Sequence, residues 1–510
     1  MPERRDLRGV GRLRVPRASW MALIGPALAA AALGCHSATP AGAPVAAAPG
    51  NATLSRLVAE AARPAGARAA LPDLSLSRVQ RAADSARARL SELATIRAET
   101  LSHQEQLSLE LLKWAATRTT WEPELYWYSF EILPAISPLR SVAASLAAAP
   151  IGTAAERSAY LELLKNVGGV IDGTREKMVG QAARQIVVPR EQIGNSLPYL
   201  KSFAVPAASS PFAPSAQRLG SVPEADRAGF AARAAGVIDS VLVAKMSALI
   251  RYAETELAPK APNAVGIGQY PAGKEAYRIL VKRETTLEVT PEEVHDIGLR
   301  AVAEINARMQ RVRDSLGFKG TKAEFHEQLR RDPQFYVKTP AEVGRRLMSY
   351  IERIEPRMPE YFSVSPKSPY GVRRLDPALE PSMTYGYYNW GATKDSSGYY
   401  NFNGSDLDRR SLLVAGPIAF HELVPGHHFQ INLARENESL PSFRRFTSHA
   451  GYTEGWGEYS SSVVAAEMGM YRDAYEIYGR LVFDAFFAVR LVVDTGMNYY
   501  GWSRPRAWPT

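Results

Sequence analysis

The chain has 510 residues, a formal net charge of +9 and a single cysteine. Six arginines in the first 17 residues face only Glu3 and Asp6, so the residues after 34 keep a mild charge of +5 without any basic run. This balance gives little support to nucleic-acid binding. One cysteine excludes intrachain disulfides, so the core alone must hold the fold.

Residues 1–35 are typical of a signal sequence. The arginines precede an uncharged run from Ala18 to Gly34, which is too short and too rich in alanine for a membrane span. A lone cysteine after this run resembles a bacterial lipoprotein cleavage and acylation site, and it predicts lipidation of Cys35. The expected protein is exported to the periplasm or outer membrane of a Gram-negative-type bacterium and bound to the membrane through this lipid. The alternatives are cleavage after an alanine, which gives a soluble periplasmic protein, or an uncleaved anchor.

Residues 36–51 are rich in Ala, Pro and Gly and predict a flexible tether. From residue 52 onward, apolar residues recur at helical spacing. Residues 290–293 (Thr-Pro-Glu-Glu) are typical of a helix start. The Pro- and Ser-rich stretch 205–215 is a subdomain joint or only a loop. The predicted helices cover residues 54–62, 75–116 with a break near Ser102, 154–186, 223–258, 290–316, 321–331, 340–356 and 474–493.

The character of the chain changes between residues 358 and 408, where Pro, Gly, Tyr and Ser become frequent. Residues 382–388 and 398–403 predict two short strands joined by a turn.

His295 and His326 lie on predicted helices without an acidic or histidine partner pattern, so we expect both to be structural. The remaining histidines of interest gather further on, at positions 421, 427, 428 and 449.

The sequence Phe-His-Glu-Leu-Val-Pro-Gly-His-His-Phe-Gln of residues 420–430 indicates a zinc site. In the familiar H-E-x-x-H pattern, two histidines one helical turn apart hold Zn²⁺ and the glutamate is the general base. Here Pro425 stands where the second histidine would be, and the Pro-Gly pair predicts a distorted helix. A two-residue bulge would make His427 the second ligand, whereas a nearly regular helix would favour His428. The spacing leaves both open, and a metal-free polar cluster is the remaining alternative.

A third ligand is expected from the helix that begins near residue 451. Glu454 and Glu458 are spaced four residues apart, so they share a helix face. One of them can bind zinc while the other orients a ligand histidine. A solvated surface pair is the alternative, but the neighbouring aromatic residues favour burial.

Residues 421–430 followed by Glu-Gly-Trp at 454–456 resemble the bacterial "domain of unknown function 885" family, which carries H-E-x-x-P-G-H-H and then E-G-W. That family resembles the gluzincin-type zinc metallopeptidases, such as angiotensin-converting enzyme and carboxypeptidase Taq. The resemblance implies Glu454 as the third ligand, Glu422 as the general base and Glu458 behind a ligand histidine. It also implies a large, mainly α-helical body with a deep cleft and a small β-hairpin next to the metal helix, forming a single domain over residues 52–510.

Zinc peptidases commonly bind an extended substrate along an exposed strand edge near the metal. The predicted strand before the metal helix is the candidate edge, and a plain packing hairpin is its alternative. The expected substrate-binding residues are Tyr399, Tyr400, Asn401 and His449. The residue that stabilises the oxyanion would be Tyr385, Tyr388, Tyr399 or His449, or it would lie in a C-terminal part that is expected to be missing.

Residues 494–504 resemble the D-T-G-x-H…G-W segment of the same family, with Asn498 where the family has His. Family members continue with further helices, so the chain is expected to be truncated. The resulting hypothesis is a peptidase with one zinc ion that hydrolyses short peptides outside the cytoplasm. The alternatives are a catalytically inactive surface lipoprotein that binds peptide or a partner, and a non-peptide amidase with the same metal and base.

Overall fold

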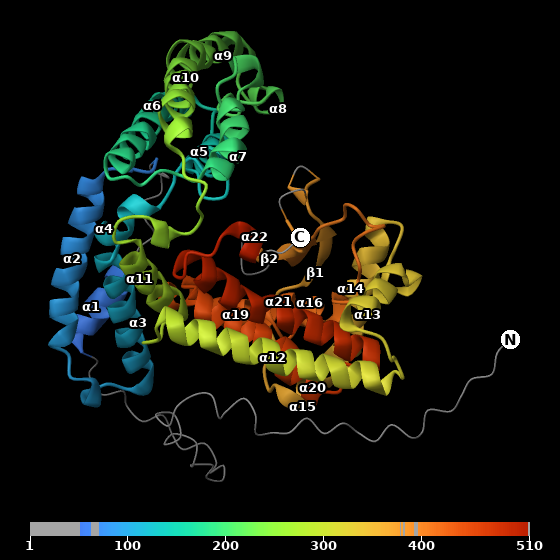
Figure 1. The fold of residues 1–510 in the computed structure, drawn as a ribbon. Coiled ribbons are helices and arrows are strands. Elements are labelled where there is room, and N and C mark those ends of the chain that lie inside the picture. Colours follow the sequence, from blue (N-terminus) through green and yellow to red (C-terminus); the bar gives the residue numbers. More distant parts are fainter. Residues whose placement is uncertain (1–50, 63–70, 378, 381–382, 392–395, 508–510) are drawn as a thin grey trace. The chain divides into compact units, whose positions relative to one another are not determined.

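The computed structural model describes residues 51–62, 71–377, 379–380, 383–391 and 396–507. Asn51–Thr510 form one compact unit, and the fold is mainly α-helical with one small sheet (Figure 1). The predicted signal segment with Cys35, and the predicted tether up to residue 50, lie outside the described residues. Among the helices in the described ranges, none combines the length and apolarity needed to cross a membrane.

The described chain begins with a small group of helices in which α2 and α3 pack side by side. Ser102 and Glu105 form a capping box at the start of α3, which confirms the predicted break near Ser102. The group consists of α1 (Ala52–Ala61), α2 (Leu76–Ala94), α3 (His103–Thr120) and α4 (Glu122–Leu125).

A second group of helices surrounds its own apolar core. The segment 205–215 belongs to this core, because Phe212 is fully buried and its carbonyl accepts a 2.8 Å hydrogen bond from the Tyr160 hydroxyl. The segment is therefore a loop inside the group rather than a joint. The helices are α5 (Pro138–Ala148), α6 (Ala154–Ala183), α7 (Arg190–Lys201), α8 (Ala216–Leu219), α9 (Glu224–Val237) and α10 (Val243–Tyr252), with π-helical turns at Ile238–Leu242 and Ala253–Leu257.

The longest pair of packed helices is formed by α12 (Pro291–Ser315) and α21 (Ala474–Asn498), which lie side by side (Figure 1). Thr290 caps α12 with the predicted capping box. His295 and His326 both contact α21, through Thr495 and Tyr478, which agrees with a structural role. Helix α11 (Gly273–Thr285) contacts α12, and α13 (Lys322–Arg331) shares its apolar core. Helices α14 (Pro340–Ile354) and α15 (Met358–Tyr361) belong to the neighbouring core around the sheet.

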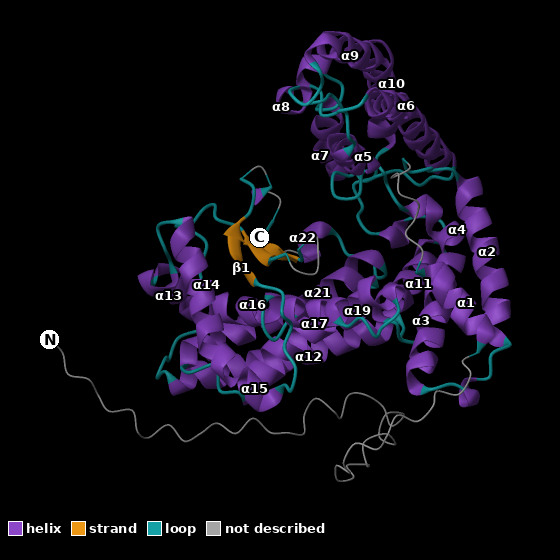
Figure 2. Ribbon diagram, turned by 180° about the vertical axis from the view of Figure 1, so that it is seen from behind, coloured by secondary structure: helices purple, strands orange, loops and turns teal. Residues whose placement is uncertain are grey.

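The sheet has three strands in the order β1–β3–β2. Figure 2 shows the strands in orange, with β1 labelled. The antiparallel pair β2 (Gly386–Asn389) and β3 (Gly398–Phe402) is the predicted hairpin, and β1 (Tyr370–Arg374), which the sequence did not predict, pairs in parallel with β3. Because β3 is the central strand, its backbone is paired on both sides. The prediction that this strand offers a free edge is therefore wrong, and the edges of the sheet belong to β1 and β2.

The remaining helices carry the candidate site and pack with α14 and the sheet around a core that contains Phe420 and Tyr400. The predicted helix 474–493 continues to Asn498, whose side chain accepts a hydrogen bond from the Ile267 backbone and donates to Asp494. These helices are α16 (Ala415–Glu422), α17 (His427–Glu436), α18 (Ser442–Phe446), α19 (Ala450–Tyr459), a π-helical turn at Ser460–Val464, α20 (Ala465–Glu467), α21 and α22 (Arg504–Ala507).

Candidate metal centre

The metal motif forms two helices with a tight turn between them. Helix α16 ends at Glu422 and α17 begins at His427. Gly426 lies so close to the preceding turn that a Cβ atom there would stand 1.8 Å from the carbonyl oxygen of His421. Only glycine permits this approach, and the turn brings the side chain of His427 back beside that of His421.

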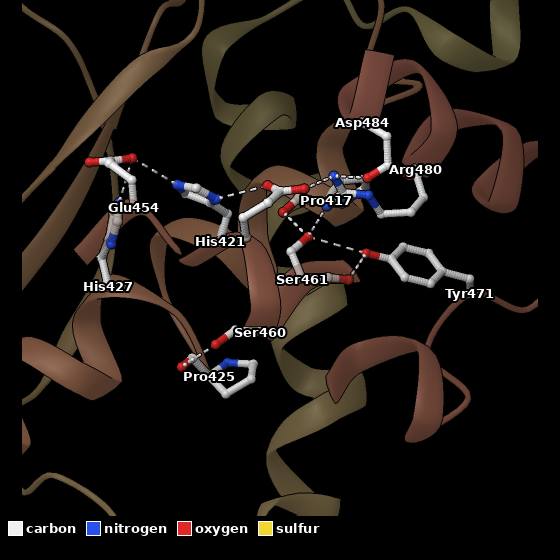
Figure 3. A network of polar contacts seen from close by, with 11 residues as sticks. Pro417, His421, Pro425, His427, Glu454, Ser460, Ser461, Tyr471, Arg480 and Asp484 are labelled. Atoms are coloured by element: carbon white, nitrogen blue, oxygen red, sulfur yellow. Dashed lines mark hydrogen bonds and ion pairs between the residues drawn. The ribbon is translucent and has the colours of Figure 1, made fainter. Parts of the chain in front are cut away.

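Three side chains from these helices and α19 converge on one point. His421, His427 and Glu454 each offer a ligand atom, and the three atoms lie within 4.8 Å of one another. Glu454 Oε2 is 3.5 Å from His421 Nε2 and 3.6 Å from His427 Nε2. Figure 3 shows the Glu454 carboxylate facing both imidazole rings. The geometry therefore selects the bulge alternative, with His427 and not His428 in the group.

His428 lies elsewhere, so its prediction as a ligand is corrected. Its ring is fully buried, is centred 4.3 Å from the ring of Tyr370, and places Nδ1 2.9 Å from the Tyr388 hydroxyl and 3.1 Å from Asn432 Nδ2. Burial lowers the pKa of His428 to about 4, so the ring is neutral in the core.

Helix α19 can approach the two histidines because it carries glycine at the contact. A Cβ atom on Gly457 would lie 2.9 Å from His421 Nε2 and 3.0 Å from His427 Cε1. The same helix is fastened to the turn of the metal motif, since Trp456 Nε1 and Ser460 Oγ donate hydrogen bonds to the Pro425 carbonyl at 2.8 and 3.1 Å. These contacts fix the position of Glu454 relative to the histidines.

Glu458 lies one helical turn after Glu454 and reaches the other nitrogen of His421, with Oε2 3.4 Å from Nδ1. This is the place that the sequence predicted for it. Its second oxygen is paired with Arg480 from α21, which also contacts Asp484. Neither residue was predicted from the sequence, although an arginine and an aspartate four residues apart between apolar residues of one helix were a usable signal.

The charges of these groups respond to one another. Burial lowers the pKa of His421, but its contacts with Glu454 and Glu458 outweigh burial and raise the pKa to about 9. The same contacts with His421 and then His427 hold the pKa of Glu454 well below its usual value. In Glu458, burial favours a higher pKa, but His421 and Arg480 prevail and lower it. Both carboxylates are therefore ionised around an imidazole.

Glu422 follows His421 directly and behaves differently from the other two glutamates. Burial raises the pKa of its carboxyl, while the nearby histidines act against this rise. The backbone of Tyr388 also acts to lower the pKa of this carboxyl, which places the edge strand β2 beside the centre. Phe487 stacks at 15° to the ring of His421, and Phe483 meets it edge-on, so the other wall is apolar.

The predicted substrate-binding residues divide into two kinds. Tyr400 and Asn401 are buried in the central strand. The Asn401 side chain accepts a hydrogen bond from Arg373 and donates to two backbone carbonyls. The prediction that these two residues bind substrate is therefore wrong. Tyr399 is half-buried under the guanidinium of Arg373. His449 begins α19 beside Arg118 and is not one of the three converging residues.

These features define a mainly α-helical protein with a histidine–histidine–glutamate centre built on a broken helix. Residues 57–510 match the model of a family described as "Bacterial protein of unknown function (DUF885)", and the chain belongs to this family. A comparison with curated proteins gives no match.

Two solved structures share this fold. The first is a presumed lipoprotein from Colwellia psychrerythraea, with 26% identity and a TM-score of 0.71, and the match covers 85% of this chain and 77% of that chain. The second is a presumed lipoprotein of unknown function from Shewanella oneidensis, with 14% identity and a TM-score of 0.60, and the match covers 87% of this chain and 80% of that chain.

Proposed function

We propose that this protein is a zinc-dependent hydrolase that cleaves short peptides outside the cytoplasm. The observation that carries the proposal is the convergence of His421, His427 and Glu454 with Glu422 directly beside them. Two imidazoles and one carboxylate are the ligand set of many catalytic zinc sites, which leave one position open. Residues 52–510 would form the single catalytic domain.

The spacing of the donor atoms supports zinc. Ligand atoms bound at about 2.0–2.1 Å in a tetrahedron lie roughly 3.3–3.4 Å from one another. The distances from Glu454 Oε2 to His421 Nε2 and His427 Nε2 are 3.5 and 3.6 Å. Two imidazoles turned toward one carboxylate at these lengths fit the edges of such a tetrahedron better than they fit two hydrogen bonds.

Bound zinc would supply Lewis acidity, which polarises a carbonyl group and lowers the pKa of a water molecule that it holds. Glu422 would accept the proton of the attacking water, because its raised pKa brings the carboxylate closer to the operating pH. It would then pass the proton to the leaving amine. Phe483 and Phe487 would exclude water from one side.

Strand β2 supports a peptide as the substrate. It forms an edge of the sheet, and the backbone of its residue Tyr388 lies near enough to the Glu422 carboxyl to act on its pKa. An extended peptide could add to this edge and bring its carbonyl near the centre.

Of the tyrosines proposed to stabilise the oxyanion, Tyr385 is favoured, because its ring packs against Phe483, which contacts His421. The Tyr388 hydroxyl, in contrast, contacts His428. We further propose that the centre lies in a deep cleft and that the protein is related to the gluzincin-type zinc peptidases.

Cys35 would carry the lipid that holds the enzyme at the membrane. The support comes from the sequence around Cys35 and from the two similar structures, which are described as presumed lipoproteins. A catalytically inactive lipoprotein that binds peptide is the second candidate, and a non-peptide amidase with the same metal and base is the third.

The test combines metal content with turnover of the purified mature chain. Glu422→Gln removes the base, and Glu467→Gln makes the same change at an exposed residue outside the centre. We expect about one zinc per chain in all three proteins, and peptide hydrolysis that only Glu422→Gln abolishes. Zinc without turnover of any peptide in the wild type would favour the binding protein. A folded protein that takes up no zinc would overturn the proposal.

A further inference from the structure

Arg480 is a buried charge that the proposed reaction does not use. It lies on α21 and is 4% exposed. A guanidinium is costly to bury unless its charge and its donors are satisfied. Asp484, one turn along the same helix, accepts a 2.8 Å hydrogen bond from Nη2, so the charge already has a local partner.

Two further contacts of Arg480 leave its own helix and lead to the metal centre (Figure 3). Nη2 is also paired with Glu458 Oε1 on α19, and the other oxygen of Glu458 is 3.4 Å from His421 Nδ1. Nη1 donates a 2.6 Å hydrogen bond to Ser461 Oγ, which in turn donates to the Pro417 carbonyl at 2.8 Å. Pro417 lies on α16, one turn before His421. Arg480 is thus connected both to the ring of His421 and to the helix that carries it.

The second ligand histidine has no such support. Among the described residues, Nδ1 of His427 forms neither a hydrogen bond nor an ion pair, although it is buried. Of the two ligand histidines, only His421 therefore has a carboxylate at its far nitrogen among the described residues, at an ion-pair distance of 3.4 Å. A carboxylate at Nδ1 of an imidazole fixes which nitrogen keeps the proton and which faces the metal.

We propose that Arg480 is a positioning residue of the metal centre: it aims Glu458 at His421 Nδ1, so that His421 presents Nε2 to the ion. This inference rests on the proposed zinc site and deepens it. Asp484 and Ser461 hold the guanidinium in place, and the arginine joins α21 to α16 and α19. A lysine would not reproduce this role, because one ammonium group lacks the planar fork that reaches Glu458 and Ser461 together.

The test measures metal binding rather than turnover. Arg480→Met keeps much of the side-chain volume and removes the charge, and Arg480→Lys keeps the charge alone. Arg353→Met is the matched control, because Arg353 makes a half-buried pair with Glu476 at 2.8 Å that also joins α21 to another helix. Zinc affinity would be measured by competition with a chromophoric chelator, and ligand geometry by the visible spectrum of the Co²⁺-loaded chain.

We expect Arg480→Met to weaken zinc binding by about 10–100-fold and to alter the Co²⁺ spectrum, with only partial recovery in Arg480→Lys. Arg353→Met should lower the melting temperature and leave both metal readouts unchanged. If Arg480→Met does not fold, Glu458→Gln breaks the same link while Asp484 still pairs with the arginine, and it should give the same loss. Wild-type affinity and spectrum in the folded variants would show that Arg480 is only a core ion pair. Failure of the wild type to bind zinc or Co²⁺ would instead overturn the proposed metal site and this inference with it.

Discussion

Gly457 lies directly against the ring of His421, at a distance that leaves no room for a side chain. A Cβ atom at residue 457 would stand 2.9 Å from His421 Nε2. Gly455, two residues earlier on α19, has nothing within 4 Å of the same position. Only Gly457 is therefore required for contact with the histidines. The same substitution at both positions distinguishes the effect of crowding the centre from the effect of helix propensity.

We predict that Gly457→Ala weakens zinc binding by about 10-fold or more, because the new methyl group displaces the ligand rings. Gly455→Ala should keep the wild-type affinity and raise the free energy of unfolding by up to about 1 kcal/mol through better helix propensity. Chelator competition and urea unfolding give the two quantities. Equal zinc affinity in both variants would contradict the placement of α19 against the histidines.

Replacement of His427 should affect zinc binding, whereas replacement of the adjacent His428 should affect only the stability of the fold. His427→Ala should lower zinc affinity by at least about 100-fold, because the loss of a ligand costs more than the loss of a residue that only supports a ligand. His428→Ala should keep the metal and lower the free energy of unfolding by about 1–3 kcal/mol, because the buried polar groups of Tyr388 and Asn432 lose their contact with the imidazole. Metal analysis of the two purified proteins decides the matter, and zinc retained by His427→Ala but lost from His428→Ala would reverse the assignment.

Tyr385 is predicted to assist turnover without holding the metal. Tyr385→Phe should lower kcat on peptide substrates by about 10²-fold, which is typical for the loss of one oxyanion donor, while zinc content and KM change little. Tyr388→Phe is the control, since that hydroxyl contacts His428 and Asn432 and its loss should lower stability rather than kcat. An unchanged kcat in Tyr385→Phe would remove this residue from the reaction.

Glu436 provides a prediction about acid stability away from the metal. Burial raises the pKa of its carboxyl, but hydrogen bonds from the N–H groups of Lys367 and Ser368 outweigh burial and hold the pKa below its ordinary value. The unfolded chain then binds the proton more tightly than the folded protein. The ionised group therefore stabilises the fold above the unfolded pKa of about 4.3, and this contribution is lost as the pH falls through the lower folded pKa.

Glu436→Gln should consequently be less stable than the wild type by about 1–2 kcal/mol at pH 7, with a gap that narrows on acidification. Urea unfolding of both proteins between pH 3 and pH 7 measures this difference. A gap of the same size at every pH would mean that ionisation of Glu436 does not contribute.

The sequence predicted the features that depend on near neighbours. The break near Ser102, the helix start at Thr290 and the interruption at Pro425 follow from a few adjacent residues, and the structure confirms them. The relation of Glu454 to Glu458 followed from helical spacing in the same way. Such local rules predicted the individual helices and placed the two glutamates on one helix face, whereas the family resemblance implied the large, mainly α-helical body and the separate roles of the glutamates.

What the sequence left open or predicted wrongly depends either on distant segments or on the exact backbone path of one turn. Which strand is central depends on β1, which lies far from β3 along the chain, so the edge was assigned to the wrong strand. The choice between His427 and His428 depended on the exact path of the bulge, which Gly426 decides through its contact with His421. The spacing of Arg480 and Asp484 signals a charge pair, but the role of Arg480 arises only when α21 brings it to Glu458 on α19.

The π-helical turn Ser460–Val464 has a consequence for the order in which the protein can be made. Its first two serines fasten the turn to Pro425 and Pro417, on either side of the first histidine. The hydrogen bonds that hold the turn of the candidate metal motif thus come from residues that leave the ribosome after His421 and His427. A nascent chain that ends before α19 holds two of the three proposed ligands. On the proposed zinc site, metal loading would therefore be complete only after α19 has been made.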